Sequence, residues 1–132
     1  MNRFLRAIMN RTFGAAGENS ALEYLKGIGY RELGRGYRTR YGEIDLIMRD
    51  GDGIVFVEVK SRREGHPEEA VDEQKQRKLT LTALQYLKNH KLLDISARFD
   101  VVALVWPETG KAPTIRHYKA AFEAVGRGQM FR

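Results

Sequence analysis

Apolar residues in the first third of the chain recur at helical spacing. Within residues 15–28, Leu25 follows Ala21 by four positions and Leu22 by three. Gly27 supplies a stop after them. We therefore expect a first helix here, with Glu18 on the same side as these apolar residues and pointing toward the body of the protein.

The middle of the chain changes to the period of β-strands. Residues 30–41 are rich in Arg and Tyr with interspersed glycines, which predicts a short irregular strand. Residues 42–49 and 54–60 alternate or run apolar, and Asp50 to Gly53 between them form a strong turn signal. These two segments predict a β-hairpin.

The second half predicts one more helix and two more strands. Residues 61–72 carry charges, a glycine and a proline, and predict a loop. A helix follows over residues 73–90, with Asp72 as its N-cap. The apolar run 97–106 fits a strand buried on both faces, and a last strand is expected around 114–118. The order helix, three strands, helix, strand, strand predicts an α/β fold.

Length and composition narrow the class of protein. A chain of 132 residues fits one domain, and the absence of cysteine excludes disulfides and thiolate metal sites. The basic segments 1–13 and 126–132 are expected to form an arm and a tail that are free to be flexible. Arginines interrupt every apolar run of the arm, so it has no signal-peptide core and cannot span a membrane, and a cytoplasmic location is expected. The net charge of +6 favours a polyanionic partner.

The predicted hairpin carries the candidate chemistry. If the turn has two or four residues, Asp45 faces Glu58 and Glu43 faces Lys60, so that all four side chains project from one face. Opposed carboxylates repel each other, and a divalent cation bound by oxygen ligands would neutralise both. The alternative is an exposed charged face on which Glu43 and Lys60 form an ordinary cross-strand pair.

Two motifs on this hairpin give a specific resemblance. GEIDLI at 42–47 and FVEVKSR at 56–62 resemble the signatures of the uncharacterised YraN-like family. That family is similar to Holliday junction resolvases of the PD-(D/E)XK, or restriction-endonuclease-like, superfamily. The resemblance extends from residue 17 to residue 102, although Ile44 replaces the proline for which the superfamily motif is named. It implies a central mixed β-sheet flanked by helices.

The resemblance also implies roles for individual residues. Asp45 and Glu58 would be ligands of Mg²⁺ or Mn²⁺, with the Val59 carbonyl completing the metal shell. Lys60 would lie beside the scissile phosphate, and Glu18 would be an auxiliary acid from the helix. For Glu18, an ion pair with a neighbouring strand is an equally good reading.

Basic residues near the hairpin are candidates for nucleic-acid contacts. They are Arg62, Arg63, Lys75, Arg77 and Lys78. The alternative is an ordinary solvated surface. The hairpin and the resemblance together predict a metal-dependent endonuclease. We expect DNA rather than RNA as its substrate, with branched DNA as the most specific expectation. The resemblance also implies a homodimer. A non-catalytic nucleic-acid-binding module and an interaction protein with a structural acidic cluster remain as alternatives.

Four polar residues outside the hairpin receive no catalytic role. His66, His90 and His117 lie on separate predicted elements without metal-ligand spacing. Asp100 interrupts the buried strand, and we expect it to pair with Arg98 or a helix residue.

Overall fold

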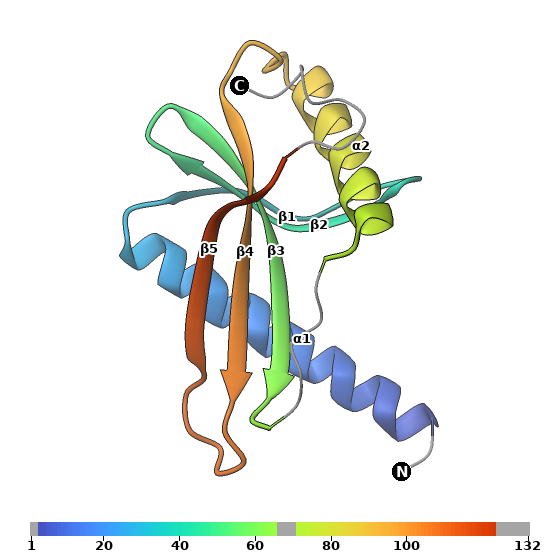
Figure 1. Ribbon diagram of the computed structural model, residues 1–132, viewed down its shortest axis with the longest axis vertical. Helices are drawn as coiled ribbons and strands as arrows, with labels where there is room; N and C mark the ends of the chain where they lie inside the picture. The colour runs from blue at the N-terminus through green and yellow to red at the C-terminus, as the bar shows by residue number, and fades with distance from the viewer. Residues whose placement is uncertain (1–2, 66–70, 124–132) are drawn as a thin grey trace.

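The element order is the one that the sequence predicts (Figure 1). The computed structural model describes residues 3–65 and 71–123, and the predicted tail 126–132 lies outside them. The elements are α1 (Arg3–Gly27), β1 (Arg31–Thr39), β2 (Gly42–Asp50), β3 (Gly53–Arg63), α2 (Glu73–Asn89), β4 (Ala97–Trp106) and β5 (Thr114–Phe122).

The strands form one mixed sheet in the order β1-β2-β3-β4-β5. Neighbouring strands are antiparallel except β3 and β4, which run parallel and are connected through α2. A parallel pair needs such a crossover, and a helix is its usual form. The mixed sheet flanked by helices confirms the expected α/β fold.

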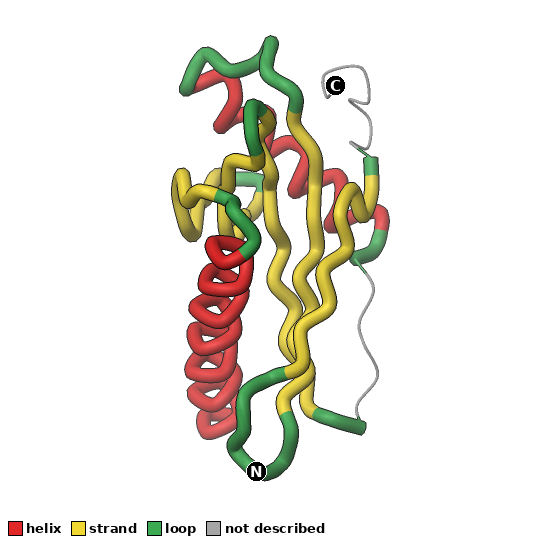
Figure 2. Tube along the Cα trace, turned by 90° about the vertical axis from the view of Figure 1, so that its left-hand side faces the viewer, coloured by secondary structure: helices red, strands yellow, loops and turns green. Residues whose placement is uncertain are grey.

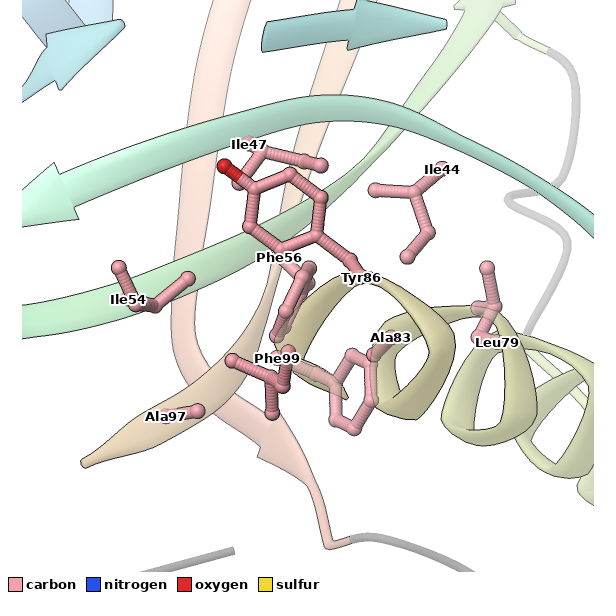
Figure 3. Packing of buried hydrophobic residues seen from close by; sticks show 10 residues of the cluster. Ile44, Ile47, Ile54, Phe56, Leu79, Ala83, Tyr86, Ala97 and Phe99 are labelled. Atoms are coloured by element: carbon pink, nitrogen blue, oxygen red, sulfur yellow. The ribbon is translucent and has the colours of Figure 1, made fainter. Parts of the chain in front are cut away.

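The two helices cover opposite faces of the sheet (Figure 2). Helix α1 packs against the sheet through Ala21, Leu22 and Leu25, which are nearly inaccessible to solvent. On the other face, Leu79 and Ala83 of α2 pack with aromatic and branched residues of the strands (Figure 3). Each helix therefore buries the apolar stripe from which it was predicted.

Helix α1 begins earlier than expected. The prediction placed its start at residue 15 and treated residues 1–13 as an arm, whereas the helix already begins at Arg3. Arginine interrupts an apolar run but is a good helix former, so the absence of a clear apolar stripe did not mean the absence of a helix. Within the described residues, no helix is long and apolar enough to cross a membrane.

Strand β3 is also longer than expected. The prediction ended it at Lys60 and placed Arg62 and Arg63 in a loop, but both belong to the strand. Parallel pairing with β4 continues to the pair Arg63 and Trp106. The strand partner, which local sequence does not reveal, holds these polar residues in an extended conformation.

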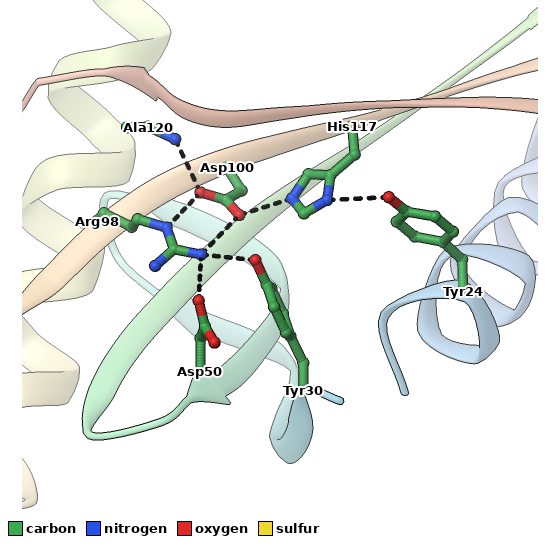
Figure 4. Close-up of polar contacts among 7 residues, drawn as sticks. All are labelled: Tyr24, Tyr30, Asp50, Arg98, Asp100, His117 and Ala120. Carbon is green, nitrogen blue, oxygen red and sulfur yellow. Dashed lines mark hydrogen bonds and ion pairs between the residues drawn. The ribbon is translucent and has the colours of Figure 1, made fainter. Parts of the chain in front are cut away.

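A polar network joins α1 to the far strands (Figure 4). The carboxylate of Asp100, buried in β4, accepts hydrogen bonds from Arg98 Nε at 2.9 Å and from the Ala120 N–H at 3.0 Å. Its Oδ2 lies 2.7 Å from Nε2 of His117, whose Nδ1 lies 3.2 Å from the Tyr24 hydroxyl on α1. The expected pairing of Asp100 with Arg98 is confirmed.

The same network reaches the turn of the hairpin. Arg98 Nη2 donates to the Tyr30 hydroxyl at 2.7 Å and to Asp50 Oδ2 at 2.9 Å. His90 has a structural contact of its own, stacked on Tyr86, while His66 lies outside the described residues.

We predict that replacing Asp100 with alanine strongly destabilises the protein. Breaking a buried ion pair leaves its partners uncompensated, and such losses are about 3 kcal/mol or more. Asp50→Ala is the matched control, because this carboxylate is 38% exposed and its loss should cost about 1 kcal/mol or less. Urea unfolding of both variants measures the loss in unfolding free energy. Equal losses would contradict the conclusion that Asp100 is the centre of the polar network.

Candidate metal centre

The candidate site lies where β2 bends away from β3. The predicted hairpin register is confirmed from Asp50, which pairs with Gly53, back to Leu46, which pairs with Val57, and the ladder between the two strands ends there. Ile44 packs in the α2 core, although Leu46 two positions later packs in the α1 core. Residues two apart on a regular strand share a face, so the alternation is broken at Asp45.

The bend has a counterpart in the neighbouring strand. Arg35 pairs with Leu46 and Tyr37 with Ile44, so Gly36 lies beside the bend at Asp45. The backbone of Gly36 has a φ of +57°, a conformation that glycine adopts at little cost. Figure 1 shows the consequence, because β1 and β2 turn out of the direction of the other strands and toward α2.

Asp45 lies at this bend, and Glu58 lies close enough on β3 for their charges to interact. Instead of facing Glu58 as a paired residue, Asp45 accepts a hydrogen bond at 2.8 Å from the N–H of Val59. Glu58 is almost fully buried on the side of α2. Burial, followed by the charge of Glu58, raises the pKa of Asp45 to about 8. The two carboxylates thus form a close pair in which ionisation of both is unfavourable.

Glu18 approaches the same pair from α1. Burial, then Glu43 and Glu58, raise the pKa of Glu18, so the helix acid is electrostatically part of the cluster. Its neighbour Gly17 permits this approach, because a Cβ at that position would overlap Oγ of Ser61 on β3 and lie 3.1 Å from Leu104. Among the described residues the buried Ser61 hydroxyl has no hydrogen-bond partner.

The predicted pairing of Glu43 with Lys60 is wrong. The β2–β3 ladder ends before these residues, and Glu43 instead accepts a hydrogen bond at 3.0 Å from Arg38 Nε of β1. Lys60 lies on β3, partly buried, and makes no ion pair with the described residues. The prediction assumed that β2 and β3 stay paired as far as Glu43 and Lys60. Because β2 bends at Asp45, these two residues do not face each other.

The cation that reaches Glu58 is Lys75, in the first turn of α2. Its Nζ lies 2.6 Å from Glu58 Oε1. The expected N-cap Asp72 is confirmed and accepts a hydrogen bond at 2.8 Å from the Lys75 N–H. Lys75, predicted as a phosphate contact, is therefore part of the acidic site itself.

The other predicted nucleic-acid residues lie on β3 and α2, the elements that carry Glu58 and Lys75. Arg63 and Lys78 are exposed, Arg62 is partly buried, and Arg77 is paired at 2.8 Å with Glu73 of its own helix. None of these contacts tests a role in binding nucleic acid.

The sequence analysis missed a basic turn that lies next to α2. Thr39 Oγ1 lies 3.2 Å from Thr82 Oγ1, which brings the exposed Arg38 and Arg40 to the helix that carries Lys78. The high arginine content of residues 30–41 was visible in the sequence. The position of Arg38 and Arg40 beside α2 was not, because it depends on the bend of β1 and β2.

The donor set fits a hard divalent cation with few protein ligands. Mg²⁺ commonly binds one or two carboxylates and completes its shell with water and phosphate. Asp45 and Glu58 supply that number of carboxylates. Within the described part of the chain, no three acidic or histidine residues converge as a complete ligand cage.

We predict that Gly17→Ala destabilises the protein through Ser61. The added methyl overlaps the Ser61 hydroxyl, and overpacking typically costs about 1–3 kcal/mol. Removing that hydroxyl makes room, so Ser61→Ala should recover most of the loss in the double variant. Urea unfolding of the two single variants and the double variant measures the coupling, and strict additivity would contradict this contact.

We predict that Asp45→Asn stabilises the metal-free protein increasingly as the pH rises. Because the folded-state pKa is about 8 and the ordinary value 3.8, Asp45 contributes stability at low pH that is lost as the pH rises through 8. Asparagine has no such loss and can still accept from the Val59 N–H. The advantage of the variant should grow by at least about 1.4 kcal/mol, one pKa unit, between roughly pH 5.5 and pH 8.5.

The measurement is urea unfolding in a chelator at both pH values. Asp94→Asn, on the exposed loop after α2, is the control and should show a constant difference from wild type. A constant difference for Asp45→Asn as well would show that Asp45 is not held with a raised pKa.

Comparison with known proteins places the chain in a family. Residues 17–104 match the model of the uncharacterised protein family UPF0102. A UPF0102 protein of Syntrophus aciditrophicus is 48% identical over 127 residues, covering 92% of this chain and 98% of the relative. A UPF0102 protein of Geobacter metallireducens is 43% identical over 120 residues, covering 89% and 97%, and one of Rhodopirellula baltica is 46% identical over 123 residues, covering 89% and 74%. This chain therefore belongs to the UPF0102 family, the YraN-like family that its GEIDLI and FVEVKSR motifs indicate.

Proposed function

We propose that this protein is a metal-dependent endonuclease that hydrolyses phosphodiester bonds of nucleic acid. The observation that carries the proposal is the pair of carboxylates at the bend, where burial and Glu58 raise the Asp45 pKa to about 8. Such a pair is costly to keep ionised without a cation. Strongly shifted groups of this kind concentrate at functional sites.

Each residue of the site has a defined task in this proposal. Asp45 and Glu58 hold Mg²⁺ or Mn²⁺, with the Val59 carbonyl as a further oxygen. The ion would supply Lewis-acid activation of the phosphodiester and of the attacking water. Lys60, two residues after Glu58 on the same strand, stabilises the negative charge that develops on the phosphate. Glu18 orients the water from the side of α1.

The charge around the site suits a polyanionic substrate. The chain carries a net charge of +6, and Lys75 contacts Glu58. The exposed Arg38 and Arg40 lie beside the helix that carries Lys78, and Arg63 is exposed at the end of β3, the strand that carries Glu58. Exposed basic side chains of this kind would contact the phosphate backbone and position it without reading sequence. DNA is the preferred substrate in this proposal. A branched duplex would require two such sites, and hence a homodimer.

One observation favours a second function, a nucleic-acid-binding module without catalysis. Lys75 already neutralises Glu58 at 2.6 Å, so the protein can hold this acid without any metal. In that case nucleic acid would bind through the basic surface alone.

The deciding experiment is cleavage of labelled duplex, branched and single-stranded DNA and RNA with Mg²⁺ or Mn²⁺. Asp45→Asn, Glu58→Gln and Lys60→Met should each lower the cleavage rate by at least about 10²-fold. Asp94→Asn, which removes an exposed acid beyond the far end of α2, should retain the wild-type rate.

The outcomes separate the two functions. Cleavage that requires the metal and is lost in the three site variants supports the nuclease. Binding of the same substrates that survives a chelator, with no cleavage of any of them, favours the binding module. Cleavage that persists in Asp45→Asn and Glu58→Gln would refute the proposed site.

A further inference from the structure

Lys75 occupies a position in α2 where a basic side chain does not stabilise the helix. It lies in the first turn of α2, where the positive end of the helix dipole favours acidic side chains over basic ones. Its backbone N–H is fixed by the Asp72 cap. A lysine held at this end of a helix has a local cost, and such conflicts with local preference occur mainly at functional sites.

The side chain of Lys75 is directed at the acidic pair. Its Nζ lies 2.6 Å from Glu58 Oε1, while the Glu58 side chain is only 8% exposed. Its charge also acts on Asp45, where it opposes the rise in pKa that burial and Glu58 cause. The Lys75 ammonium, with its single positive charge, therefore interacts with both carboxylates.

Lys75 also has an open route out of the site. Its side chain is 45% exposed, in contrast to the buried carboxylate that it contacts. Lysine is a flexible four-carbon stem that carries a compact charge. The ammonium can therefore move into solvent without rearrangement of α2, whose first turn stays held by Asp72.

We propose that Lys75 is an internal counter-ion that occupies the charge position of the divalent cation and is displaced when the metal binds. This inference rests on the metal site of the proposed function. Mg²⁺ binds carboxylate oxygen at about 2.1 Å, and an ammonium bonded to the same carboxylate would then lie close to a doubly charged ion. Repulsion in this partly buried place drives Lys75 outward, where it becomes available to the phosphate backbone of the substrate.

The inference separates two roles of the same residue. As a structural ion pair alone, Lys75 would stabilise the fold, and its removal would leave the intrinsic metal affinity unchanged. As a displaced counter-ion, it competes with the metal, so its removal must strengthen metal binding. The direction of the change in affinity therefore distinguishes the two roles.

The test is calorimetric titration of chelator-treated protein with MnCl₂, in the absence of nucleic acid. Lys75→Met keeps most of the stem and removes the charge, and its Kd for Mn²⁺ should fall at least about fivefold relative to wild type. Lys88→Met is the matched control, since this exposed lysine lies in the last turn of the same helix, away from Lys75. Its Kd should stay at the wild-type value.

A second measurement covers the case in which Lys75→Met folds poorly without metal. Lys75→Gln retains a hydrogen-bond donor for Glu58, and it should show the same direction of change. Thermal unfolding then compares the gain in Tm on adding saturating MnCl₂, which should be larger in both Lys75 variants than in wild type and in Lys88→Met.

The outcomes distinguish this inference from the proposed function. Wild-type protein that binds Mn²⁺ with an affinity unchanged or weakened in the Lys75 variants overturns the counter-ion and leaves the nuclease proposal standing. Absence of Mn²⁺ binding in every variant overturns the metal site and the inference together. Mn²⁺ binding that appears only after Lys75 is replaced supports the counter-ion in its strongest form.

Discussion

The end of the β2–β3 ladder at Leu46 is the constraint on which the candidate site depends. As long as two strands remain paired, their facing backbone N–H and C=O groups bond to each other and are not available to a side chain. Past Leu46, β2 departs toward α2, and the N–H of Val59 bonds to the Asp45 side chain. The end of the ladder thus frees the Val59 N–H for Asp45 and leaves this acid close enough to Glu58 for their charges to interact.

The acidic pair is tolerated because the rest of the fold supplies positive charge at defined points. Lys75 contacts Glu58, and Arg38 contacts Glu43 beside them. Both basic residues come from elements that reach this place only through tertiary structure, α2 by the crossover between β3 and β4 and β1 by its pairing with the bent strand. With Lys75 beside Glu58 and the pKa of Asp45 raised, the acidic pair can fold without a divalent cation.

Sequence patterns predicted the fold more completely than the site. The order of elements, the hairpin register from Leu46 to Asp50 and the Asp72 cap follow from short-range signals that the structure confirms. The predicted start of α1 and the predicted end of β3 were wrong. Good helix formers without an apolar stripe give a weak local signal for a helix, and a strand end that is held by a distant partner strand gives a weak local signal for a strand.

Within the site, the sequence identified the acids but not their partners. Asp45, Glu58 and Glu18 belong to one electrostatic cluster, as the motifs suggested. Pairing of Glu43 with Lys60 failed because alternation along β2 breaks at Asp45. The contact of Lys75 with Glu58 joins residues seventeen positions apart through the packing of α2 on the sheet, and no local pattern encodes that distance.

The position of Glu18 shows how the distant polar network contributes to the site. Helix α1 is fixed near its end by the Tyr24 hydroxyl, which bonds to His117 and through it to Asp100. It is fixed again at Gly17, where the absence of a side chain lets the helix lie against Ser61. Glu18 lies between these two points on a rigid helix. Its distance from the acidic pair is therefore set by contacts on the opposite face of the sheet from α2.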